Sequence, residues 1–133
     1  MKKNLDILMI GHFAKDTIDV VDGNSFNAAG GAVYYGSVVL KRLGLEVGVA
    51  TRLAPEDYHY LKELTDLGIE VDVKPAGQSS GCINIYQSAD MERRICKLNG
   101  FAGEIPLSDI PDVNAKIIMI TPIIAGEITL PTL

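Results

Sequence analysis

Short runs of apolar, branched residues alternate along this chain with stretches of helical periodicity, and this alternation limits the possible folds more than any other feature. Strand patterns cover residues 5–11, 46–51 and 69–73, and the helical patterns between them cover residues 32–43 and 55–67. Two parallel strands must be joined by a crossover, which is usually a helix. The sequence therefore predicts an α/β fold built from parallel βαβ units.

Each helical stretch has an apolar face that should pack on the sheet. In the first stretch this face consists of Ala32, Tyr35, Val39 and Leu43, and in the second of Tyr58, Leu61, Leu64 and Leu67. Lys41 and Arg42 lie in the last turn of the first helix, where cations are favourable, and Gly44 ends it.

A pattern typical of antiparallel strands interrupts this alternation. Residues 82–87 and 93–98 alternate between apolar and polar side chains on either side of a turn at 88–90, which predicts a β-hairpin. One face of this hairpin should be covered, while the other meets water or a ligand. A half-buried strand is also predicted at residues 17–21, followed by a polar loop at 22–27.

The last part of the sequence predicts one more strand and no helix after it. Residues 116–121 have the composition of a buried parallel strand. The segment from Gly126 to Leu133 is short and rich in β-branched side chains, so it is a poor crossover helix for a further parallel strand.

Composition places the chain among globular proteins. It has 133 residues with 47% apolar side chains, which is sufficient for one domain with a core. No apolar stretch approaches the roughly 20 residues that span a bilayer, and no signal peptide is recognisable, so we expect a soluble, cytoplasmic protein. The net charge of −5, without a basic cluster, argues against nucleic acid and membrane as partners.

Candidate functional residues follow the first strand and precede the first helix. Asp16 comes shortly after the strand, and Gly30 and Gly31 open the helix. Ligands of α/β sheets bind beyond the carboxyl ends of the strands, where a carboxylate that accepts two hydroxyl hydrogen bonds suits a polyol. Paired glycines let backbone N–H groups approach a ligand, although a tight turn uses the same pair.

These residues also carry a resemblance to a known family. The first signature of the PfkB/ribokinase family of sugar kinases resembles Gly11-x4-Asp16 and Ala29-Gly30-Gly31-Ala32-Val33-Tyr34-Tyr35-Gly36-Ser37, continued by Leu40-x-Arg42-Leu43-Gly44. Later segments of the family are similar, in the same order, to Leu67-Gly68-Ile69-Glu70-Val71 and Leu98-Asn99-Gly100-Phe101-Ala102. The resemblance covers nearly the whole chain.

The resemblance implies a ribokinase-like, Rossmann-type α/β/α sheet with a small β-sheet lid, of which residues 1–133 form a truncated, N-terminal part. The lid strands would lie at approximately 17–29 and 80–98. The resemblance also implies that the intact protein transfers a phosphoryl group from ATP, with Mg²⁺, to a hydroxyl of a sugar, polyol or nucleoside.

Individual residues match the family's substrate site in part. Asp16 matches the acid that binds substrate hydroxyls, and Gly30 and Gly31 match the glycines that contact substrate. Tyr34 and Tyr35 stand in the region where the family usually has a substrate-binding asparagine, which argues against ribose as the substrate. The Gly-His-Phe-x-x-Asp opening is more similar to inositol and nucleoside kinases.

The catalytic half of the family pattern is not found here. The Gly-Ala-Gly-Asp motif, which supplies the anion hole and the aspartate base, is absent from these residues, as are the ATP-binding segments that accompany it. No Walker A motif replaces them. We therefore assign no catalytic residue and expect no kinase activity from the chain alone.

Other side chains have both a structural and a functional interpretation. His12 either donates to a substrate hydroxyl or fills a structural position after the first strand. Asn84 and Tyr86 share one face of the hairpin and either contact substrate or pack in the core. His59 is expected on the solvated surface.

Arg93 and Arg94 either reach a phosphate or, as we favour, discourage pairing at a sheet edge. Cys82 and Cys96 are too few for a disulfide framework. One hairpin register would pair them, yet we expect free, partly buried thiols. No cluster of residues has the spacing of a metal site.

Two further functions remain as alternatives. One is a non-catalytic module that binds a small molecule or assembles with a partner, because an uncovered sheet edge and apolar face favour association. The other, a Rossmann-like nucleotide binder, is less favoured because no G-x-G-x-x-G follows the first strand. A homodimer is plausible by resemblance, since lids of this family often form oligomer contacts.

Overall fold

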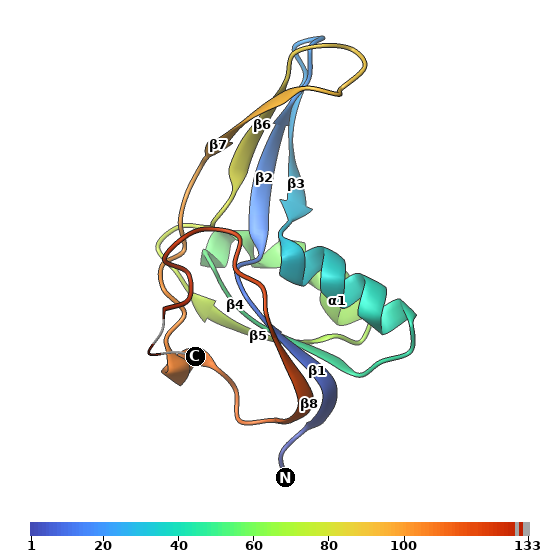
Figure 1. Cartoon of the computed structure of the whole chain (residues 1–133), viewed down its shortest axis with the longest axis vertical. Coiled ribbons are helices and arrows are strands. Elements are labelled where there is room, and N and C mark those ends of the chain that lie inside the picture. Colours follow the sequence, from blue (N-terminus) through green and yellow to red (C-terminus); the bar gives the residue numbers. More distant parts are fainter. Residues whose placement is uncertain (130, 132–133) are drawn as a thin grey trace.

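A parallel four-stranded sheet forms the base of the molecule (Figure 1). The computed structural model describes residues 1–129 and residue 131. The core strands are β1 (Asn4–Ile10), β4 (Val47–Leu53), β5 (Glu70–Pro75) and β8 (Asn114–Ile120), in the order β5-β4-β1-β8. All three pairings between neighbours are parallel, which confirms the predicted α/β class.

A second, smaller sheet projects from one end of the core sheet (Figure 1). It contains β2 (Ala14–Asp19), β3 (Ser25–Gly30), β6 (Cys82–Tyr86) and β7 (Arg94–Leu98), in the order β3-β2-β6-β7. The predicted hairpin is confirmed, since β6 and β7 pair in antiparallel register. We call these four strands the small sheet.

The polar loop expected at residues 22–27 is wrong in its second half. Ser25, Phe26 and Asn27 belong to β3, which pairs with β2 as an antiparallel hairpin. This end of β3 is exposed, so it lacks the alternation between buried and exposed side chains by which a strand is recognised. A hydrogen bond of 3.1 Å from Thr17 Oγ1 to Asn27 Oδ1 joins the polar side chains across the two strands.

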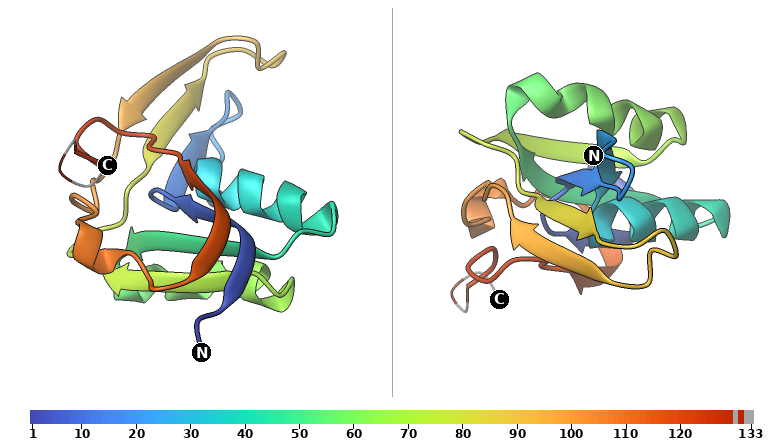
Figure 2. Two further views of the ribbon diagram at one scale, coloured as in Figure 1. Left: turned by 60° about the horizontal axis from the view of Figure 1, so that its bottom comes forward. Right: turned by 90° about the horizontal axis from the view of Figure 1, so that it is seen from above.

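The helices α1 (Ala32–Arg42) and α2 (Lys62–Asp66), with the 3-10 helix η1 (Pro55–Leu61), pack along the core sheet (Figure 2). Leu61 and Leu64 are buried against it, which confirms the face predicted for the second helical stretch. The first half of that stretch is a 3-10 helix rather than an α-helix. His59 is exposed, as expected.

The apolar face predicted for the first helix is wrong. Tyr35, Val39 and Leu43 are 62%, 57% and 72% exposed. The helix instead buries Val33 and Ser37. Gly36 also faces the sheet, and a side chain in its place would meet the Met9 methyl group of β1. The glycine allows α1 to lie close to the sheet. The buried face, with Val33 and Ser37, is less apolar in sequence than the exposed face, with Tyr35, Val39 and Leu43.

Irregular chain covers the other face of the core sheet. Ile105, which precedes the 3-10 helix η2 (Leu107–Asp109), packs with Leu8 and Ile10 of β1 and with Ile128. No α-helix lies on this face in the described residues 99–129. The sequence predicts that residues 126–133 are a poor crossover helix, and this segment lies partly outside the described residues.

The expectation that the last strand is buried is also wrong. β8 is parallel to β1, as predicted, but it forms the edge of the described sheet. Its apolar side chains from Ile117 to Ile120 are between 36% and 58% exposed. A run of apolar residues indicates a strand, whereas its burial depends on what lies beside it.

The orientation of α1 leads to a first prediction. Val33→Ala should lower the free energy of unfolding by about 1–3 kcal/mol, because Val33 is fully buried and truncation leaves a cavity. Val39→Ala is the matched control on the same helix and should change it by less than about 0.5 kcal/mol. Urea denaturation measures both; a larger effect at Val39 would contradict this orientation of the helix.

Candidate functional site

A pocket of about 350 Å³ lies on one face of the small sheet, against the start of α1 and the segment that follows β8. It is lined by Ala14, Asp16, Ile18, Gly31, Tyr35, Cys82, Asn84, Tyr86, Arg94, Cys96 and Ile123. These residues come from β2, β6, β7, the start of α1 and the segment that follows β8. The pocket, which we call the inter-sheet pocket, therefore lies beyond the carboxyl ends of β1 and β8, where α/β sheets bind ligands.

Asp16 of β2 is held in place by the backbone of β6. Its Oδ1 atom accepts a hydrogen bond of 2.9 Å from the Cys82 N–H. Its Oδ2 atom lies against the Gly30 backbone, so closely that a side chain at residue 30 would overlap it. No described residue donates a hydrogen bond to Oδ2. Asp16 thus offers an oriented carboxylate oxygen to a ligand in the pocket.

Gly31 connects the small sheet to α1 at the edge of the pocket. Its φ of +91° is in the region that favours glycine. A Cβ atom at this position would lie 2.7 Å from the His12 carbonyl oxygen, so the chain here passes too closely for any side chain. Gly31 brings the positive N-terminal end of the α1 dipole to the same pocket as Asp16.

Asn84 and Tyr86 of β6 point into the pocket, as their shared parity on the strand predicts. Asn84 is only 5% exposed, and its Oδ1 atom has no hydrogen-bond partner among the described residues. A buried carbonyl oxygen without a partner costs about 1–3 kcal/mol. A donor from a bound ligand would remove this cost, so Asn84 Oδ1 points to a hydroxyl-bearing or amino-bearing ligand.

Arg94 of β7 is a pocket residue that the sequence interpretation assigned to edge protection. It lies opposite Tyr86 in the register of the hairpin, and its interaction with the Tyr86 hydroxyl raises the pKa of the guanidinium. β7 is also the edge strand of the small sheet, and Arg93 is exposed on it. The sequence could indicate a pocket role for Arg94 only if the hairpin register were known, because this register places Arg94 opposite Tyr86.

The two tyrosines of α1 separate in the structure. Tyr35 lines the pocket. Tyr34 does not; its hydroxyl donates a hydrogen bond of 2.7 Å to Glu63 of α2. This hydrogen bond, with the negative charge of Glu63, raises the pKa of Tyr34 to about 12. Tyr34 therefore joins two helices. Of the two tyrosines of α1, Tyr35 is the one whose phenol is available to a ligand.

His12 is fully buried beside the pocket rather than in it. Its Nε2–H donates to the Gly103 carbonyl at 2.7 Å, and Nδ1 lies 2.7 Å from Ser80 Oγ. Because Nε2 carries the proton of the neutral ring, Nδ1 is an acceptor, so the Ser80 hydroxyl donates to Nδ1 while its oxygen accepts the Ala102 N–H at 2.9 Å. Burial lowers the pKa of His12, and the imidazole is neutral.

Glu127 completes this buried network, and sequence reasoning did not identify it. Its carboxylate accepts the backbone N–H of His12 and also those of Ile123 and Ile124, at 2.9 and 3.0 Å. Oε2 lies 3.6 Å from His12 Nδ1. The segment after β8 is thereby fixed to the junction between β1 and β2, which places Ile123 at the pocket.

A partly buried ion pair fixes the base of the small sheet. Lys15 Nζ of β2 lies 2.9 and 3.0 Å from the two carboxylate oxygens of Asp57 in η1. The Ser79 hydroxyl donates to the same carboxylate at 2.6 Å and accepts the Ala54 N–H at 3.1 Å. These hydrogen bonds lower the pKa of Asp57 in spite of its burial.

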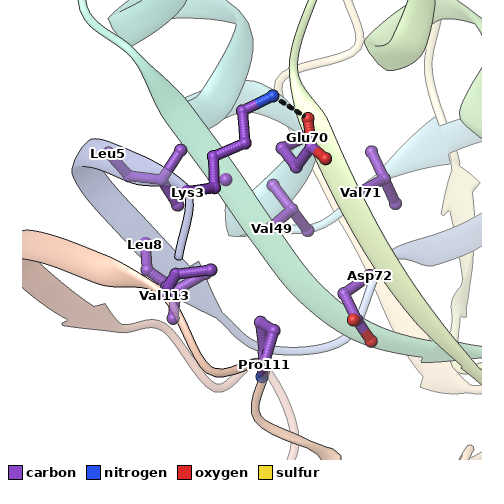
Figure 3. Close-up of a pocket in the computed structure, with 10 residues that line it drawn as sticks. Lys3, Leu5, Leu8, Val49, Glu70, Val71, Asp72, Pro111 and Val113 are labelled. Atoms are coloured by element: carbon purple, nitrogen blue, oxygen red, sulfur yellow. Dashed lines mark hydrogen bonds and ion pairs between the residues drawn. The ribbon is translucent and has the colours of Figure 1, made fainter. Parts of the chain in front are cut away.

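Another cavity, of about 120 Å³, lies at the opposite end of the core sheet (Figure 3). Leu5 and Leu8 line it from the first part of β1, and the ion pair between Lys3 and Glu70 lies at its edge. Asp72, which faces this cavity, is 3.1 Å from Lys74 Nζ. The cavity adjoins the amino ends of β4 and β5, away from the edge at which such sheets bind ligands.

No protein-family model matches the chain, and no curated protein matches it in sequence. Solved structures do match. A pyrophosphate-dependent kinase of the ribokinase family, complexed with a pyrophosphate analog and myo-inositol, is 28% identical with a TM-score of 0.81. This match covers 95% of the present chain and 43% of the kinase.

Two further structures extend the comparison. A sulfate complex of a pyrophosphate-dependent kinase in the ribokinase family is 30% identical with a TM-score of 0.80, over 92% of this chain and 43% of that chain. A sugar kinase from Pyrococcus horikoshii, in complex with ATP, is 19% identical with a TM-score of 0.64, over 79% and 38%. The last similarity shows the fold alone.

The parallel core sheet and the small sheet together define a ribokinase-like fold. The chain is similar to kinases of the PfkB/ribokinase family, as its motifs indicated, and it spans less than half the length of the solved structures that it matches. Among the helices of the described residues, none is long and apolar enough to cross a membrane.

The neutral, buried His12 makes stability depend on pH. An unfolded histidine takes up a proton near pH 6.5, whereas burial lowers the pKa of His12 in the folded chain. The free energy of unfolding should therefore fall as the pH drops from 7 to 5, with a slope approaching about 1.4 kcal/mol per pH unit. Urea denaturation across this range measures the slope.

The two histidines of the chain provide the control for this prediction. His12→Gln should remove most of the slope, and His59→Gln should retain it because His59 is exposed. Loss of the slope in the His59 variant alone would show that another group is responsible.

Proposed function

We propose that this chain forms the acceptor-binding part and the lid of a kinase that phosphorylates a hydroxyl of a polyol, sugar or nucleoside. The observation that carries the proposal is the unpartnered, buried Asn84 Oδ1, which lines the same pocket as the oriented Asp16 carboxylate. Hydroxyl groups are the donors that both acceptors need. The myo-inositol bound in a similar kinase supports a cyclic polyol as the first acceptor to test.

The geometry suggests how the acceptor is held. Asp16 accepts hydroxyl hydrogen bonds at Oδ2 while the Cys82 N–H fixes Oδ1, so the carboxylate does not need to reorient on binding. Asn84 of the neighbouring strand β6 accepts a second hydroxyl of the same acceptor molecule. The small sheet then excludes water from the acceptor, and the N-terminus of α1 faces the same space.

The residues present here do not fit a phosphoryl donor. The Gly-Ala-Gly-Asp motif does not occur in the sequence, and no group of three metal-ligating side chains occurs among the described residues. ATP with Mg²⁺ is the donor proposed for an intact protein that carries that motif. Pyrophosphate is the alternative, because the more similar kinases depend on it. We place this activity in the cytoplasm.

Asp16 should determine acceptor affinity. Asp16→Asn should weaken the binding of myo-inositol, or of the best-bound polyol in a panel, by about ten- to a hundredfold, because hydrogen bonds to a charged acceptor are lost. Isothermal titration calorimetry of the chain without donor measures this. Asn84→Ala should weaken binding in the same direction, since it removes the unpartnered oxygen.

The matched control is Asp19→Asn on the same strand. Residue 19 has the opposite parity to residue 16, so its side chain lies on the other face of β2 and outside the pocket lining. The affinity of the Asp19→Asn variant for the polyol should equal that of the unsubstituted chain. Equal losses at both positions would contradict a specific role for Asp16.

The chain on its own should not catalyse phosphoryl transfer. Transfer depends on stabilising charge at the phosphates, and the anion hole and aspartate base of the family are not in these residues. Incubation with a bound polyol and either ATP or pyrophosphate should yield no phosphorylated product by mass spectrometry. Product formed by the purified chain, and absent from the Asp16 variant, would overturn this prediction.

A second candidate function is a non-catalytic assembly module. The exposed apolar side chains of β8, from Ile117 to Ile120, lie on an edge strand that can pair with another chain or a second copy. The calorimetric titration separates the two candidates. A folded chain without affinity for any polyol would favour the module, whereas Asp16-dependent affinity favours the kinase half.

A further inference from the structure

Two cysteines lie side by side in the inter-sheet pocket. In the register of the hairpin, Cys96 of β7 is opposite Asn84, and Cys82 is two residues before Asn84 on β6. The two cysteines are therefore diagonal neighbours on the face that lines the pocket. They are the only cysteines of the sequence.

The two thiols differ in their surroundings. Cys96 is exposed, which corrects the expectation that both are partly buried, while Cys82 is half-buried beneath it. Burial, together with the neighbouring Cys96 and the Asp16 carboxylate, raises the pKa of Cys82 to about 11. Cys82 is thus a protected neutral thiol at neutral pH, and Cys96 is the thiol that a reagent from solvent reaches first.

We propose that Cys82 and Cys96 are a redox pair, which a low-molecular-weight disulfide converts to an intramolecular disulfide, and that this bridge weakens acceptor binding in the inter-sheet pocket. The first half stands on the hairpin geometry alone. The second half rests on the proposed function, because it requires the pocket to bind a polyol.

The chemistry is two successive thiol–disulfide exchanges. The Cys96 thiolate attacks one sulfur of oxidised glutathione, and the glutathione S–S bond breaks to release one glutathione thiolate. Cys82 then loses its proton and attacks the Cys96 sulfur of the mixed disulfide, which releases the second glutathione. The two protein thiols are oxidised, one glutathione disulfide is reduced to two thiols, and the two protein protons go to the leaving thiolates.

The position of β7 makes closure possible. Diagonal neighbours on antiparallel strands have Cα atoms about 7–8 Å apart, and a disulfide needs at most about 6.8 Å, so β7 must move by roughly 1 Å. β7 is an edge strand whose residues 94–98 are all exposed and which pairs only with β6. Little else therefore holds it against such a shift.

The same shift would disturb the acceptor site. Cys96 faces Asn84 across the hairpin, and the Cys82 N–H positions Asp16, so the bridge pulls on the neighbours of both acceptor oxygens. Arg94 moves with Cys96 because both lie on β7. Oxidation should therefore weaken polyol binding by about tenfold, which is the effect of one disturbed hydrogen bond to the ligand.

The experiment combines intact mass with calorimetry. The chain is equilibrated with oxidised and reduced glutathione at several ratios, quenched with acid and weighed. The expected product is a monomer that has lost two hydrogens and has no thiol left for alkylation. Its affinity for myo-inositol, or for the best-bound polyol of the panel, should be about tenfold weaker, and a thiol reductant should restore it. Retained glutathione, two free thiols or a disulfide-linked dimer would overturn the pair.

Variants separate the remaining outcomes. Cys96→Ser removes an exposed thiol, so it should fold and should form no bridge. The double variant C82S/C96S should have an affinity, whatever its value, that oxidant leaves unchanged. A bridge without loss of affinity in the unsubstituted chain would overturn the regulatory half. A reduced chain that binds no polyol would contradict the proposed function, while the mass measurement would still decide the redox pair.

Discussion

The buried imidazole of His12 is the point on which the arrangement of the two sheets depends. It follows β1, where the chain leaves the core sheet for the small sheet, and it contacts three other segments. Ser80 precedes β6, Gly103 follows β7, and Glu127 follows β8. Because a neutral imidazole donates at one nitrogen and accepts at the other, the ring bonds to Gly103 and Ser80, while the backbone N–H of the same residue donates to Glu127.

Contacts at this junction, outside the pocket itself, fix the segments that line the pocket. The ion pair between Lys15 and Asp57 fixes the base of the small sheet on η1, and the carboxylate of Glu127 fixes the segment that carries Ile123. The residues that face the pocket are therefore oriented by partners outside it. The contacts that hold the surrounding segments in place are made by other residues. Asp16 and Asn84 can therefore each present to that space an oxygen atom without a hydrogen-bond partner.

Patterns along the sequence identified the core strands, the β6–β7 hairpin and the residues at the end of β1, because local periodicity indicates strands, but they missed β3. They failed where neighbours decide. Val39 is as apolar as Val33, so periodicity alone does not show which of the two faces the sheet. Arg94 was placed at an edge and Glu127 was missed, because their roles depend on the hairpin register and on contacts across more than 100 residues.

The residues of the proposed acceptor site all lie within this chain, although it spans less than half the length of the solved structures that it matches. Asp16 and Asn84 lie on β2 and β6 of the small sheet, and Cys82, which orients Asp16, belongs to β6. None of these contacts requires a residue that binds the phosphoryl donor. The kinases that resemble this chain include one solved with a pyrophosphate analog and one solved with ATP. If the small sheet recognises the acceptor as proposed, this recognition is physically separate from the choice of donor, and binding can be measured without any donor present.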